Sequence, residues 1–65
     1  MPLYTFAYLL AGREWHRGTF DSGLGVQEFA EKLSELGPRE PTEEIRVWEG
    51  DDTERAPDAI VRREA

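Results

Sequence analysis

Hydrophobic and polar positions alternate along the first third of the chain, and this pattern predicts a β-hairpin. Residues 2–11 are largely apolar on both alternating sets, which is typical of a central strand that is covered on both faces. Residues 14–21 form the second predicted strand. Between them, Gly12 and Arg13 suit a two-residue type II′ turn, because this turn favours glycine at its first position. The turn predicts four pairs, which are Leu10 with Trp15, Tyr8 with Arg17, Ala7 with Gly18 and Thr5 with Phe20.

Apolar residues then recur at helical spacing, which predicts a helix over residues 24–36. Ser22 or Gly25 can cap its start. Gly37 and Pro38 predict its end, since glycine readily turns left-handed and proline cannot continue a helix. The apolar stripe consists of Val26, Phe29, Ala30, Leu33 and Leu36.

The rest of the chain predicts one further strand and a charged loop. Residues 44–49 alternate as a strand does, and residues 50–58 combine acids with turn residues. Residues 59–65 are expected to form a short strand, a helical turn after Pro57 or a tail, and we favour the short strand or a docked segment. We therefore expect a single α+β domain of 65 residues with ββαβ topology. Its antiparallel sheet has three strands, or four if the C-terminal segment pairs, in the order 2-1-3, with the helix on one face.

The small residues of the hairpin indicate which face the helix covers. Ala7 and Gly18 allow a close approach, so we expect the helix on their side of the sheet. One helix cannot cover both faces, so the opposite, aromatic face needs the C-terminal segment, a second copy or a partner to cover it. The predicted core under the helix is completed by Leu3, Leu9, Phe20, Ile45 and Val47. The opposite face collects Tyr4, Phe6, Tyr8, Leu10, Trp15 and Trp48.

Charge is distributed unevenly along the sequence. The net charge is −6, and residues 28–58 alone hold eleven acids against four bases, a net of −7. Such a field repels the phosphates of nucleic acid and attracts basic surfaces, which argues against direct nucleic-acid binding.

Catalytic constellations are poorly represented in the sequence. His16 is the single histidine and lies in a predicted strand without a nucleophile–base set around it. The acidic loop lacks EF-hand spacing, so we expect no metal site, no cofactor and no enzymatic activity. The chain has no cysteine and no apolar run of the roughly 20 residues that span a membrane, which favours a cytoplasmic protein that does not enter membranes.

The acids predict an interaction surface. Carboxylates spaced about 6 Å apart on a helix face can imitate the phosphates of a nucleic-acid strand, and a basic nucleic-acid-binding protein would accept them instead. The competing interpretation is that the acids serve solubility. The predicted acidic patch comprises Glu28, Glu31, Glu35, Glu43, Glu44, Glu49, Asp51, Asp52 and Glu54.

The small size, the acidity and the stretches VQEFAEKLSEL and EEIRVWEGDDTE resemble the phage-encoded anti-CRISPR inhibitors, in particular those that block type I surveillance complexes by DNA mimicry. This resemblance implies a protein partner such as the subunit that reads the protospacer-adjacent motif, in the host cytoplasm. The alternative is a structural or assembly module that dimerises or docks through its aromatic face, so both a monomer and a homodimer remain open. The aromatic candidates are Tyr4, Phe6, Tyr8, Trp15 and Trp48.

Overall fold

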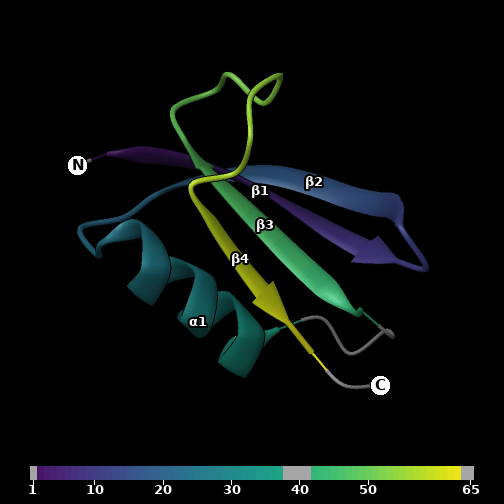
Figure 1. Ribbon diagram of the computed structural model, residues 1–65. Coiled ribbons are helices and arrows are strands. Elements are labelled where there is room, and N and C mark those ends of the chain that lie inside the picture. Colours follow the sequence, from purple (N-terminus) through teal and green to yellow (C-terminus); the bar gives the residue numbers. More distant parts are fainter. Residues whose placement is uncertain (1, 38–41, 64–65) are drawn as a thin grey trace.

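One helix packs on a four-stranded antiparallel sheet in the computed structural model, which describes residues 2–37 and 42–63 (Figure 1). The strand order β2-β1-β3-β4 confirms the α+β class and the central position of the first strand. The C-terminal segment supplies β4, an edge strand beside β3. The elements are β1 (Leu3–Leu10), β2 (Arg13–Asp21), α1 (Val26–Leu36), β3 (Glu44–Glu49) and β4 (Ala59–Arg62).

The hairpin turns one residue earlier than predicted. Ala11 and Gly12 both have positive φ, 53° and 77°, as a type I′ turn requires at both central positions. The register then shifts at Trp15, where β2 contains a β-bulge. Consequently the predicted register is wrong, and all four predicted pairs are replaced. The observed pairs include Tyr8 with His16, Ala7 with Arg17, Phe6 with Gly18 and Thr5 with Thr19.

The bulge reverses the predicted faces of β1 relative to β2. The early turn alone moves the pairing by two residues and keeps the faces, and the bulge then leaves a net shift of one residue, which sends every side chain of β1 to the other side. The tyrosines of β1 face α1, and the Tyr4 ring stacks on Phe29 with centroids 4.9 Å apart. The Tyr4 hydroxyl also donates to the carbonyl oxygen of Leu24 at 2.6 Å, which fixes the chain before the helix. The expectation that the aromatic face lies opposite the helix is therefore wrong. The buried core consists of Tyr4, Tyr8, Phe29, Ala30, Ile45, Val47 and Ala59.

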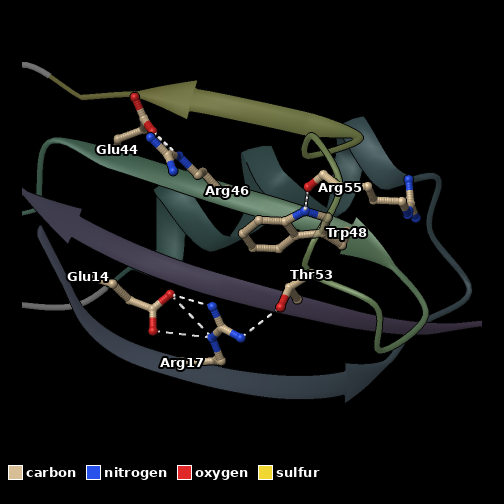
Figure 2. Close-up of polar contacts among 7 residues, drawn as sticks. All are labelled: Glu14, Arg17, Glu44, Arg46, Trp48, Thr53 and Arg55. Carbon is tan, nitrogen blue, oxygen red and sulfur yellow. Dashed lines mark hydrogen bonds and ion pairs between the residues drawn. The ribbon is translucent and has the colours of Figure 1, made fainter. Parts of the chain in front are cut away.

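The opposite face of the sheet is covered by the loop between β3 and β4. Trp48 is only 4% exposed there and packs with Ala7 and Leu9. Its Nε1 donates to the carbonyl oxygen of Arg55 at 2.8 Å (Figure 2). The Thr5 hydroxyl donates to the carbonyl oxygen of Gly50 at 2.7 Å, which holds the start of the loop. The chain's own loop, rather than the C-terminal segment or a second molecule, thus covers Trp48.

The helix covers the sheet unevenly. It packs against β3 and β4, as Figure 1 shows, and leaves the β1–β2 half of the same face less protected. Every residue of β2 is exposed except Gly18, which is half-buried. The helix side of the sheet is therefore open to solvent along β2.

Candidate partner-binding surfaces

The predicted acids of the helix lie on its outer side. Glu28, Glu31 and Glu35 are all exposed, and the ammonium of Lys32 lies 3.4 Å from a carboxylate oxygen of Glu35. The structure therefore keeps this row together, with its charge partly offset by Lys32.

The predicted acids of the loop lie on the other side of the sheet. Asp51, Asp52 and Glu54 belong to the loop that covers Trp48, whereas α1 packs on the opposite face (Figure 1). The helix row and the loop acids thus do not form one continuous surface. The nine predicted acids are split among separate parts of the molecule.

Two further predicted acids lie at the opposite end of the sheet. Glu43 donates its backbone N–H to the carbonyl oxygen of Leu9, and Glu44 pairs with Leu9 across the sheet. The Glu44 carboxylate forms an ion pair with Arg46 (Figure 2) and a second one with Arg62. A cavity of about 430 Å³ opens here, but Glu44 balances two of the arginines that line it. This end of the sheet is consequently of mixed charge.

Acids gather where β1 begins and β2 and β3 end. Cross-strand pairing brings Leu3 opposite Asp21 and Tyr4 opposite Glu49, and the Gly50–Asp58 loop starts at the same edge. We call this group the acidic end. It holds six carboxylates and the guanidinium of Arg55, for a net charge of −5. The guanidinium of Arg17 also donates to Thr53 of the loop at 2.8 Å, but Arg17 forms an ion pair with Glu14, so this pair does not change the net charge (Figure 2). Its acids are Asp21, Glu49, Asp51, Asp52, Glu54 and Asp58.

Arg55 is held inside this group of acids. Its guanidinium donates to both carboxylate oxygens of Asp58 at 2.8 Å. This hydrogen bond, together with the charges of Asp58, Asp52 and Glu49, raises the pKa of Arg55. The hydrogen bond from Arg55 and a second one from the backbone N–H of Glu49 lower the pKa of Asp58. Asp58 therefore acts mainly as a structural anchor of the loop, which leaves the other acids of this end to face solvent.

Sequence reasoning missed Asp21 and Asp58 as members of the acidic end. They lie 37 positions apart, at the end of one strand and directly before another. Only the strand order of the sheet shows that these two residues lie at the same end of the molecule.

The predicted aromatic face divides between interior and surface. Tyr4, Tyr8 and Trp48 are buried, and Trp48 lies on the opposite side of the sheet from the tyrosines. Phe6 is half-buried and Trp15 is 43% exposed. These five residues are thus not one binding face.

An apolar groove runs between α1 and β2 instead. Its volume is about 360 Å³, and its walls are apolar apart from the side chain of Lys32. Phe20 is 59% exposed and Leu36 is 83% exposed, so the groove opens to solvent along both rims. We call this surface the apolar groove. It is lined by Phe6, Phe20, Leu24, Phe29, Lys32, Leu33 and Leu36.

Comparison of the chain with protein-family models, curated proteins and solved structures found no match. In residues 2–37 and 42–63, no three histidine or acidic side chains converge as a metal site would require. Within the same ranges, no helix is long and apolar enough to cross a membrane. The two surfaces with unusual properties are therefore the acidic end and the apolar groove.

Proposed function

We propose that the protein is an inhibitor without enzymatic activity that binds a basic nucleic-acid-binding surface of another protein in place of nucleic acid. The observation that supports this proposal is the acidic end, with its net charge of −5 on one side of a 65-residue domain. Like charges within about 8 Å of each other are not decoupled by physiological salt. Repulsion among these carboxylates lowers the stability of the free protein, and binding of a basic partner relieves this repulsion.

The contact surface in this proposal is narrower than the nine acids predicted from the sequence. It is centred on Asp51, Asp52 and Glu54, which carry no ion pair among the described residues, with Asp21 and Glu49 beside them. The hydrogen bond from the Glu54 backbone N–H to Asp52 and the Arg55–Asp58 pair order the loop that carries these acids. A preorganised loop loses less conformational entropy on binding than a disordered one.

The partner class in this proposal is a type I CRISPR surveillance complex, as the resemblance to anti-CRISPR inhibitors implies. The test uses a purified complex of this type with a fluorescent target duplex, and anisotropy reports whether the protein displaces the duplex. We expect displacement that weakens steeply between about 50 and 200 mM salt, because several charge pairs contribute.

Two charge-matched variants locate the contact. Asp51→Lys with Asp52→Lys reverses two charges at the acidic end, and Glu31→Lys with Glu35→Lys reverses two on the outer side of α1. All four side chains are exposed, so both proteins should fold. The first variant should lose displacement by about a hundredfold and the second much less, since only the first repels the basic surface. Equal losses would show that net charge, and not the acidic end, drives the effect.

A further inference from the structure

We propose that the apolar groove is a docking site for one amphipathic helix of a partner protein, with basic residues along the flank that faces α1. The proposal is independent of the acidic end, because the groove lies on the helix side of the sheet and the loop acids lie on the other.

The dimensions of the fold leave room for one helix. Four strands spaced about 4.8 Å apart make a face roughly 15 to 20 Å wide, and packed helices interdigitate with their axes about 8 to 10 Å apart, so such a face accommodates two helices. Because α1 packs on β3 and β4 and the core beneath it already buries Tyr4 and Tyr8 of β1, a second helix beside α1 would lie over β2. Such a helix extends the helical layer over the strand that α1 leaves exposed.

The groove offers apolar contacts on both of its walls. On the sheet side, Phe20 stacks on Phe29 with ring centroids 6.0 Å apart, yet Phe20 remains 59% exposed. On the helix side, Leu36 is 83% exposed and lies one turn beyond Lys32. Large apolar side chains rarely gather in the open on a monomer without a binding role. An occupant with leucines at i, i+3, i+4 and i+7 presents the matching stripe.

The acids beside the groove indicate that the side of the docked helix facing α1 should be basic. Glu28 and Glu35 lie seven residues apart, about 10.5 Å along α1, and both flank Lys32 on the solvent side of the groove. Lys32 is engaged by Glu35 at 3.4 Å. A docked helix with two lysines or arginines seven residues apart therefore places one beside each glutamate.

A second copy of this chain fits the groove less well. The helix that it offers is α1, whose exposed charges are Glu28, Glu31 and Glu35 against Lys32. Inserting that helix would bring acids against acids along the whole flank, which costs affinity. A basic partner helix would instead place lysines or arginines against these acids, which favours binding.

The test uses a synthetic 18-residue helical peptide with a leucine stripe and lysines seven residues apart, and a matched peptide with glutamate in place of lysine. Amide chemical-shift mapping of the protein should report changes at β2 and at the groove side of α1 with the lysine peptide. Affinity by calorimetry should fall for the glutamate peptide by about tenfold or more. Changes confined to the β3–β4 loop, or equal affinity for both peptides, would overturn the proposal.

Two matched variants test the site itself. Leu36→Ser removes an exposed leucine of the groove, and Ile60→Ser removes an exposed isoleucine on the opposite face of the sheet. Leu36→Ser should weaken lysine-peptide binding by about tenfold or more, while Ile60→Ser leaves it unchanged. Equal effects would contradict the proposal. Concentration-dependent dimerisation in sedimentation that Leu36→Ser abolishes would also overturn it, because the occupant would then be a second copy.

Discussion

Replacement of Trp48 by phenylalanine separates a structural role for this residue from a binding role. The indole is 4% exposed, and its Nε1 donates to the carbonyl oxygen of Arg55 at 2.8 Å. Phenylalanine keeps an aromatic ring but removes the donor and part of the volume. We therefore expect Trp48→Phe to destabilise the protein rather than to affect only partner binding.

The expected magnitude is about 2 kcal/mol. Loss of the hydrogen bond and the unpaired carbonyl of Arg55 contribute about 1 kcal/mol, and the missing volume beside Ala7 and Leu9 contributes a similar amount. A domain of 65 residues has a free energy of unfolding of roughly 3 to 10 kcal/mol. The change thus lowers Tm by about 10 °C.

The assay is urea unfolding followed by far-ultraviolet circular dichroism, which does not depend on the tryptophan being replaced. Trp15→Phe is the matched control, because Trp15 is 43% exposed and its replacement should cost no more than about 0.5 kcal/mol. Thr5→Val removes the other bond that holds the loop, from Thr5 to Gly50. Since both bonds hold the same loop, the double variant should show a coupling energy of at least about 0.5 kcal/mol. If Trp48→Phe costs no more than Trp15→Phe, the loop does not cover Trp48 and this part of the fold is wrong.

Three other predictions follow from single contacts. Because the hydrogen bond from Arg55 lowers the pKa of Asp58, the charged form stabilises the fold above about pH 4, and this contribution is lost as the pH falls. Asp58→Asn should therefore destabilise the protein more at pH 7 than at pH 2, as measured by urea unfolding. A Cβ on Gly18 would lie 2.7 Å from the tip of the Phe6 ring, so Gly18→Ala should cost about 1 kcal/mol alone but nothing in a Phe6→Leu background, as measured by a double-mutant cycle. Burial raises the pKa of Tyr8 above 10.0, although the charge of Arg63 lowers it in part, so stability should decline above pH 10 in the natural protein and decline less in Tyr8→Phe.

The elements of this fold were predictable from the sequence because each carries a local signal. The helix stripe from Val26 to Leu36 has helical period, and the alternation of residues 44–49 matches β3. The helix begins at Val26, two residues later than predicted. In the segment before it, the Ser22 hydroxyl accepts a hydrogen bond from the N–H of Leu24. Such shifts at helix ends are common.

The faces of the sheet were not predictable, because the two alternating sets of β1 are both apolar. The alternation therefore left only the small residues Ala7 and Gly18 to indicate which face meets the helix, and the bulge in β2 decided it. Glycine preference favoured a turn at Gly12-Arg13, but the chain turns at Ala11-Gly12 with Ala11 at positive φ. That turn alone keeps the predicted faces, and the bulge at Trp15, which has no signal in the sequence, reverses them.

The candidate surfaces were predictable in composition but not in grouping. The acids of the loop were identified, yet Asp21 joins them only through its pairing with Leu3. Trp48 was predicted as a contact, since nothing local indicates that the loop after it folds back over the ring. The apolar groove depends on α1 lying over β3 and β4, which is a tertiary property.

Capture from the lysate of a CRISPR-bearing bacterium tests the central claim most directly, with three forms of the protein as bait. The forms are the natural chain, Asp51→Lys with Asp52→Lys, and Glu31→Lys with Glu35→Lys, and quantitative mass spectrometry compares what each retains. The account predicts that the natural chain and the helix variant retain the same nucleic-acid-binding protein, and that the loop variant does not. Recovery of no nucleic-acid-binding protein by the natural chain, or equal recovery by all three, would contradict it.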